Sequence, residues 1–106
     1  MDNNTETMTT IKISSYAVED HMNRLYEYDH DGDGYKHIDK PGAYLTVIKW
    51  GKLVDTIELT APALQDFIED MEYQCEFAYE GLSDSYAVAY RARCRRALNK
   101  LKEATR

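Results

Sequence analysis

Residues 43–64, AYLTVIKWGKLVDTIELTAPAL, are the part of the chain around which the other predicted elements are arranged. Two runs within it, residues 43–49 and 53–59, are rich in β-branched and aromatic residues and contain no proline, so each is predicted to form a strand. Because Trp50 does not suit the positive φ of a two-residue type I′ turn, we expect a type I turn followed by Gly51 as a bulge. The stretch therefore predicts a β-hairpin.

A long amphipathic helix is predicted directly after the hairpin, over residues 60–80. Thr60 suits the N-cap, Pro62 falls in the first turn, where its missing N–H is harmless, and Gly81 is a natural left-handed stop. The apolar spacing predicts one buried stripe, which consists of Leu64, Phe67, Ile68, Met71, Cys75 and Ala78. The opposite side carries the acids Asp66, Glu69, Asp70, Glu72, Glu76 and Glu80.

The N-terminal part adds a strand and a helix. Residues 9–13 (TTIKI) alternate in polarity and are predicted to pair with the hairpin as a third strand. Ser14 or Ser15 then caps a helix of about 14 residues. Its inward positions are Val18, Met22 and Leu25. Its solvent-facing positions are expected to be Glu19, Asp20, Asn23, Arg24 and Glu27.

The last helix is predicted to begin at Ser83 or Asp84 and to run antiparallel to the helix before it. Its apolar stripe consists of Ala87, Tyr90, Cys94, Ala97, Leu98 and Leu101. The element order is thus β-α-β-β-α-α, an α+β fold in which a small antiparallel sheet packs against two or three helices. We expect residues 1–8 to be disordered and residues 9–106 to form a single domain.

Composition narrows the classes of protein to which the chain can belong. No apolar run approaches the ~20 residues of a membrane span. The first ten residues have neither the basic nor the apolar region of a signal peptide, so we expect a cytoplasmic protein. Without an export signal, Cys75 and Cys94 are expected to be reduced and buried, with a disulfide between them as the alternative.

Charge is distributed unevenly along the chain, whose net charge is −6. Residues 1–90 hold 18 acids and 6 Lys or Arg, whereas residues 91–106 hold 7 Lys or Arg and one acid. The balance is therefore −12 for the body and +6 for the C-terminal end. Such a body repels polyanions over distances near the Debye length.

The loop DHDGDGY, residues 29–35, resembles the start of an EF-hand calcium loop. In that family, acids at the first, third and fifth positions bind one ion; here they are Asp29, Asp31 and Asp33. The resemblance ends at the twelfth position, where Lys40 replaces the bidentate glutamate. One alternative is that this loop is a weak calcium-binding module. The other is that it is an Asp/Gly-rich turn whose side chains hydrogen-bond its own backbone. His30 and His37 suggest no ligand set of defined geometry.

Four glutamates of the predicted helix, Glu69, Glu72, Glu76 and Glu80, recur at spacings of three and four and form one ridge. Their carboxylates would lie roughly 5–6 Å apart, which is comparable to the phosphate spacing of a nucleic-acid strand. Tyr73 and Tyr79 lie beside them, in a chain with nine tyrosines, and tyrosine is enriched at protein interfaces. The alternative is that this face is simply solvated and that the basic helix next to it offsets the negative charges of its glutamates.

Two other surface features remain open. The basic helix could bind nucleic acid through Arg93, Arg96 and Lys100, although the acidic body opposes this. Trp50, near the hairpin turn, would be a binding anchor if exposed and a core residue if folded back.

No nucleophile elbow, phosphate loop or histidine paired with a nucleophile is visible, so the sequence does not predict an enzyme. We expect a non-enzymatic acidic module that docks on a basic protein site, in the manner of an inhibitor that imitates nucleic acid. In its short acidic character the chain looks like accessory proteins of phages and mobile elements. No resident cofactor is expected, and a homodimer is compatible with each alternative.

Overall fold

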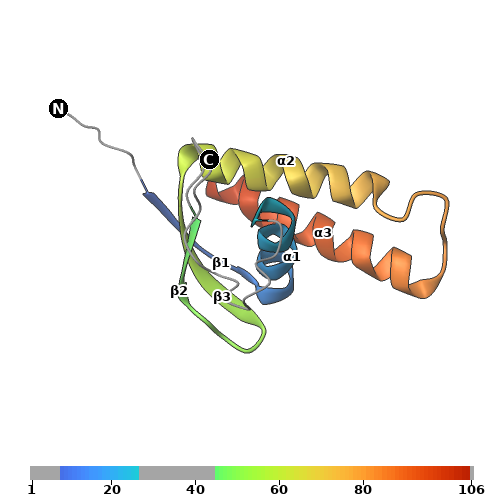
Figure 1. Ribbon diagram of the computed structural model, residues 1–106, viewed down its shortest axis with the longest axis horizontal. Coiled ribbons are helices and arrows are strands. Elements are labelled where there is room, and N and C mark those ends of the chain that lie inside the picture. The colour runs from blue at the N-terminus through green and yellow to red at the C-terminus, as the bar shows by residue number, and fades with distance from the viewer. Residues whose placement is uncertain (1–7, 27–44, 106) are drawn as a thin grey trace.

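The structure is a computed structural model that describes residues 8–26 and 45–105. It has an α+β fold with the expected order β-α-β-β-α-α (Figure 1). The elements are β1 (Met8–Ser14), α1 (Ser15–Tyr26), β2 (Leu45–Lys49), β3 (Val54–Thr60), α2 (Ala61–Phe77) and α3 (Ser85–Ala104). Met8, expected to be disordered, is the first residue of β1.

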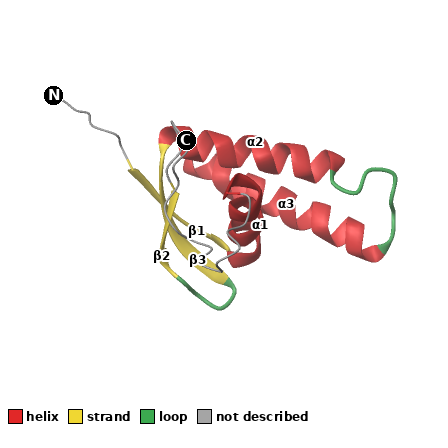
Figure 2. Ribbon diagram, in the orientation of Figure 1, coloured by secondary structure: helices red, strands yellow, loops and turns green. Residues whose placement is uncertain are grey.

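The sheet is antiparallel with the order β1-β3-β2, so β3 is its central strand. The register pairs Ile11 with Ile57 and Leu45 with Leu59. Alternate residues of a strand face opposite sides, and these four are all buried, so one face of the sheet is apolar. The three helices lie on that side of the sheet (Figure 2). The predicted N-terminal strand is therefore confirmed, and it completes the hairpin as an edge strand.

The helices α2 and α3 form an antiparallel pair whose far end projects beyond the sheet (Figure 1). The predicted caps are confirmed: Thr60 accepts from the N–H of Ala63 at 3.2 Å, and Asp84 accepts from the N–H of Ala87 at 3.1 Å. The stripe predicted for α3 is buried along its whole length, and the stripe of α2 is buried from Ala63 to Cys75. Both cysteines are free and buried.

The expected end of α2 at Glu80 is wrong, because the helix ends at Phe77. Ala78 leaves the helical conformation with ψ 129°, and Tyr79 and Gly81 both have positive φ. The guanidinium of Arg91 donates to the carbonyl oxygens of Ala78, Tyr79 and Leu82 at 2.9–3.0 Å. Such a side chain satisfies carbonyls that a longer helix would have used. A residue of α3 thus fixes the loop that ends α2.

The expected bulge at Gly51 is also wrong, because the irregular register falls between Val47 and Lys49. The N–H of Gly51 instead donates to Oδ1 of Asp55 at 3.0 Å, and Asp55 is fully buried. A β-carbon on Gly51 would lie 2.0 Å from the carbonyl oxygen of Val54. Glycine is thus required here by the close approach of backbone.

Replacing Gly51 with alanine is expected to destabilise the protein by about 1–3 kcal/mol, because the backbone of the β2–β3 loop must shift to make room. The measurement is urea denaturation followed by circular dichroism. Lys52→Ala, in the same loop but exposed, is the matched control and should change stability by less than about 0.5 kcal/mol. Equal stability of Gly51→Ala and the wild type would show that the loop is free to relax.

Candidate functional site

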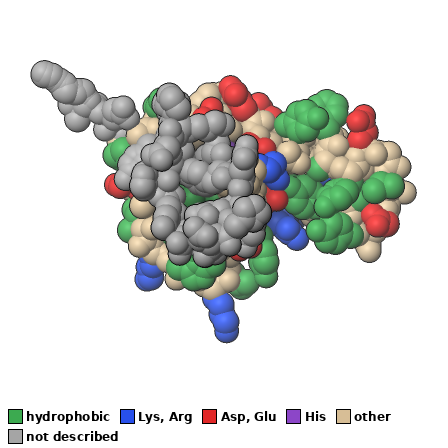
Figure 3. Space-filling view, in the orientation of Figure 1, with side chains coloured by type: hydrophobic (Ala, Val, Ile, Leu, Met, Phe, Trp, Pro, Cys, Tyr) green, Lys and Arg blue, Asp and Glu red, His purple; other side chains and the backbone are tan. Residues whose placement is uncertain are grey.

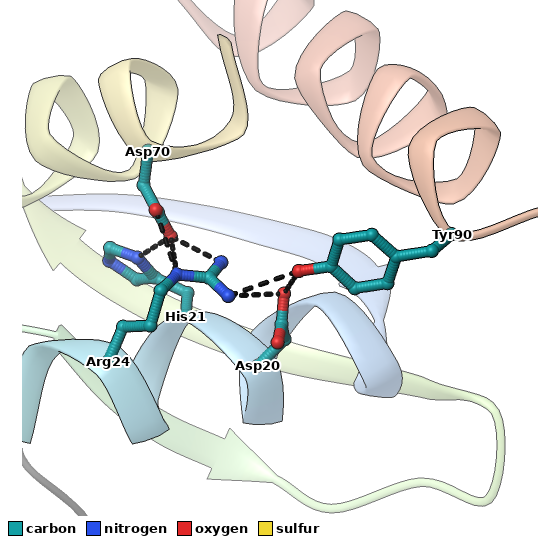
Figure 4. Close-up of polar contacts among 5 residues, drawn as sticks. All are labelled: Asp20, His21, Arg24, Asp70 and Tyr90. Atoms are coloured by element: carbon teal, nitrogen blue, oxygen red, sulfur yellow. Dashed lines mark hydrogen bonds and ion pairs between the residues drawn. The ribbon is translucent and has the colours of Figure 1, made fainter. Parts of the chain in front are cut away.

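A polar network joins the three helices (Figure 4). It consists of Asp20, His21 and Arg24 from α1, Asp70 from α2 and Tyr90 from α3. The guanidinium of Arg24 donates from Nε to Oδ1 of Asp70 at 2.9 Å and from Nη2 to Oδ2 at 2.7 Å, a two-pronged ion pair. The network ties α1 to the α2–α3 pair.

His21 is 3% exposed and stacks on Phe67, with 4.1 Å between ring centroids. Its Nδ1 is 2.8 Å from Oδ2 of Asp70, the pairing that a general base requires. Its Nε2, however, is buried and has no hydrogen-bond partner among the described residues. Neither hollow described below is lined by His21, so a substrate has no route to this nitrogen through them. His21 therefore connects α1 to α2 through its stack on Phe67 and its contact with Asp70.

Hydrogen bonds and nearby charges keep Arg24 and Asp70 ionised and Tyr90 neutral. Burial lowers the pKa of Arg24, but the carboxylates of Asp70 and Asp20 raise it by more, so the guanidinium stays protonated. Burial raises the pKa of Asp70, yet hydrogen bonds from His21 and Arg24 outweigh this and hold it below its ordinary value. Burial and a hydrogen bond to Asp20 raise the pKa of Tyr90, whose hydroxyl stays neutral.

Of the positions expected to face solvent, Arg24 is exposed as predicted, whereas Asp20 and Asp70 are only partly exposed. Helical periodicity assigns every polar residue beside the apolar stripe to the surface. Here the stripe's flank is covered by another helix, so these side chains meet each other instead. The only signal in the sequence was the spacing of Asp20 and Arg24, four residues apart, which form an ion pair at 2.8 Å.

The predicted acidic ridge is only partly formed. Glu80 lies in the loop after α2, so it does not continue the helical row of Glu69, Glu72 and Glu76. Glu72 lies 3.5 Å from Nζ of Lys102, and both side chains are about half exposed. A hollow of about 370 Å³ between the helices is lined by Glu72, Cys75, Glu76, Arg95, Leu98 and Lys102. Cations of α3 therefore flank the row.

Large apolar side chains are exposed at the projecting end of the α2–α3 pair (Figure 3). We define the aromatic tip as Tyr73, Phe77, Tyr79, Leu82 and Tyr86, with exposed fractions from 44% to 62%. Tyr73 packs on Phe77 with 5.0 Å between ring centroids, and Tyr79 meets Tyr86 edge-on at 5.6 Å. The side chains support one another, so the tip is a structured surface.

The charged side chains around the tip are acidic. Residues 53–90 hold nine acids and no lysine or arginine. Glu76, Glu80 and Asp84 lie around the tip and are exposed. The nearest basic residue along the chain, Arg91, has its guanidinium bound to loop carbonyls. The tip is thus an apolar surface with an acidic rim.

Trp50 is 55% exposed, in the β2–β3 loop. That loop lies at the sheet, away from the projecting end of the helices (Figure 1). Trp50 is therefore exposed, but it lies away from the tyrosines and glutamates of the α2–α3 pair.

The three cations of the nucleic-acid alternative come together on one flank of α3. Arg93, Arg96 and Lys100 line a hollow between α3 and the edge strand β1, and Lys12 of β1 joins them. The volume of the hollow is about 260 Å³. Its remaining lining residues are Ile13, Ser14, Val54 and Ala97, and none is acidic. We call this hollow the cationic groove.

Comparisons of the chain with protein-family models, with curated proteins and with solved structures found no match. Within the described ranges, no helix is both long and apolar enough to cross a membrane.

The calcium loop with Asp29, Asp31 and Asp33, together with His30 and His37, lies outside the described residues. Among residues 8–26 and 45–105, no group of three or more His, Cys, Asp or Glu is placed to hold a metal ion. The calcium hypothesis stays a prediction, which titration calorimetry with calcium would test.

Proposed function

We propose that this chain is a non-enzymatic protein-binding module that docks its aromatic tip on a basic protein surface. The observation that carries the proposal is the set of five large apolar side chains exposed together at the projecting end of the helical pair. An exposed apolar cluster with a polar rim is typical of a protein–protein interaction site.

The contact would be driven mainly by the tip's rings. Tyrosine and phenylalanine bury roughly 150–250 Å² each, at about 25 cal/mol per Å² of apolar area removed from water. The rings already pack on one another, so docking requires little new ordering of side chains. The tip therefore has the properties of an interface core, where binding energy is concentrated.

The acidic rim selects a basic partner. The carboxylates of Glu76, Glu80 and Asp84 lie beside the rings, and they would attract a cationic surface and repel an acidic one. A protein site that binds nucleic acid has this positive charge, so inhibition by imitating nucleic acid remains the finer proposal. Because Lys102 offsets Glu72 and Arg95 lines the same hollow as Glu76, we assign the charge first to Glu80 and then to Glu76, with a lesser part for Glu69 and Glu72.

The tip variant Tyr73→Ala/Tyr86→Ala is expected to weaken partner binding at least ten-fold, because it removes two of the exposed rings. The partner is first captured with a photo-crosslinking amino acid at Leu82, and its affinity is then measured with purified proteins. The matched control is Ile48→Ala/Leu53→Ala, which removes two equally exposed apolar side chains from the sheet end. It should leave the affinity within two-fold.

A second pair of variants tests the rim. Glu76→Lys/Glu80→Lys should abolish binding, whereas Glu19→Lys/Glu103→Lys, with the same charge change on exposed positions elsewhere, should weaken it only modestly. All these positions are exposed, so the thermal midpoint should shift by no more than a few degrees. Capture of an acidic partner, or equal losses in the rim and control variants, would contradict the proposal.

A further inference from the structure

We infer that the cationic groove binds a ligand that carries two or more phosphate groups. The site is separate from the aromatic tip: it lies between α3 and the sheet, whereas the tip is the far end of the helical pair. The inference therefore stands whether or not the tip binds a protein.

The groove gathers like charges from opposite ends of the chain. Lys12 belongs to β1, and Arg93, Arg96 and Lys100 belong to α3. Among the described residues, none of these four forms an ion pair with a carboxylate, although acids outnumber bases 19 to 13 in the chain. Four cations around one hollow repel each other. A bound anion would relieve that repulsion.

The other flank of α3 gives the comparison. Lys102 pairs with Glu72, and Arg91 donates to three loop carbonyls. Arg95 lines the other hollow together with Glu72 and Glu76. One side of the same helix is thus supplied with acceptors, and the side facing β1 is not. The positive charges of α3 that have no acidic partner among the described residues therefore lie on the side of the helix that forms the groove.

The guanidinium of Arg93 is positioned by two aromatic rings. Its guanidinium carbon lies 5.2 Å from the ring centroid of Tyr16 and 5.8 Å from that of Tyr90. Stacking on aromatic faces orients the guanidinium and leaves its N–H groups for an acceptor, and a planar guanidinium matches phosphate oxygens two at a time. The small residues Ser14 and Ala97 in the lining let a ligand approach closely.

The volume of the groove and its four cations indicate the chemical class of the ligand. The volume of about 260 Å³ is smaller than the roughly 300–1,000 Å³ of most drug-sized ligand pockets. One phosphate carries a charge of about −1.5 to −2 at neutral pH, so two would balance four cations. The acidic body disfavours a long polyanion. Linked phosphates of a nucleotide and a terminal phosphate on a nucleic acid share this chemistry.

The test uses pyrophosphate as the probe, titrated into the full chain at low ionic strength and followed by calorimetry and by amide shifts of Ser14 and Ala97. The groove variant is Arg96→Gln/Lys100→Gln. The matched control is Arg95→Gln/Lys102→Gln, the same change on exposed positions of the same helix but on its other flank. We expect the dissociation constant to rise at least ten-fold in the groove variant and at most three-fold in the control.

Two further titrations identify the source of the phosphate. Tight binding of a nucleoside triphosphate indicates a free nucleotide, and preference for a 5′-phosphorylated oligonucleotide over the same strand without that phosphate indicates a nucleic-acid end. Equal binding of both strands, with none of pyrophosphate, would overturn the inference in favour of backbone binding. Equal losses in the groove and control variants would overturn it as a net-charge effect. Light scattering that shows self-association, abolished by the groove variant, would assign the groove to the acids of a second copy and would also overturn it.

Discussion

Replacing Arg24 with methionine is expected to lower the free energy of unfolding by about 2–3 kcal/mol. The change leaves the mostly buried carboxylate of Asp70 without its two-pronged partner and also removes the ion pair to Asp20. We expect less than the roughly 3–5 kcal/mol of a fully buried pair, because a third of the Arg24 side chain is exposed. Chemical denaturation measures the loss.

Two measurements distinguish lost charge pairing from lost packing. Arg95→Met, on an exposed part of α3, should change stability by less than about 1 kcal/mol. The second measurement is the acid dependence. The folded pKa of Asp70 lies below its ordinary 3.8, so its contribution to stability is present above about pH 4 and is lost as the pH falls through the folded pKa. In Arg24→Met this acid loss should be smaller. An unchanged acid dependence would contradict the assigned role.

Replacing Phe67 with alanine is expected to destabilise the protein by about 3–5 kcal/mol. Phe67 is fully buried, and its ring stacks on that of His21, so truncation opens a cavity where α1 meets α2. Thermal and urea denaturation would measure the loss, and the near-ultraviolet spectrum would report looser packing.

The same helix offers the matched control. Phe77→Ala removes the same side chain from the exposed tip and should change stability by less than about 1 kcal/mol. Phe67→Leu, which keeps most of the buried volume, should fall between the two. Similar losses for Phe67→Ala and Phe77→Ala would show that the tip is part of the folding core, which would also weaken its assignment as a binding surface.

Part of the candidate site could be predicted from the sequence. Tyr73, Tyr79, Glu76 and Glu80 do lie at one end of the molecule, because residues close together on a helix and the loop after it stay close in space. Arg93, Arg96 and Lys100 share a flank of α3 for the same reason. Of the residues that were not predicted, Lys12 of the groove and Tyr86 of the tip come from other elements, whereas Phe77 and Leu82 belong to α2 and the loop after it.

Local patterns predict the helices and strands, their order and the N-caps of α2 and α3, but not the end of α2. The β-branched runs, the spacing of apolar residues and the capping side chains of Thr60 and Asp84 act between neighbours in the chain, so no distant contact is needed to read them.

Which polar residues face solvent, and where charges meet, depends on how the helices and strands pack against one another. Asp70 lies at the flank of a stripe, and whether that flank meets water or Arg24 depends on how α1 crosses the helical pair. Likewise, Arg91 of α3 binds the loop carbonyls that follow α2. Lys12 lies in the groove with Arg93, Arg96 and Lys100, although it precedes them by more than eighty residues in the sequence. Such contacts join segments that are distant along the chain, and helical or strand periodicity carries no information about them.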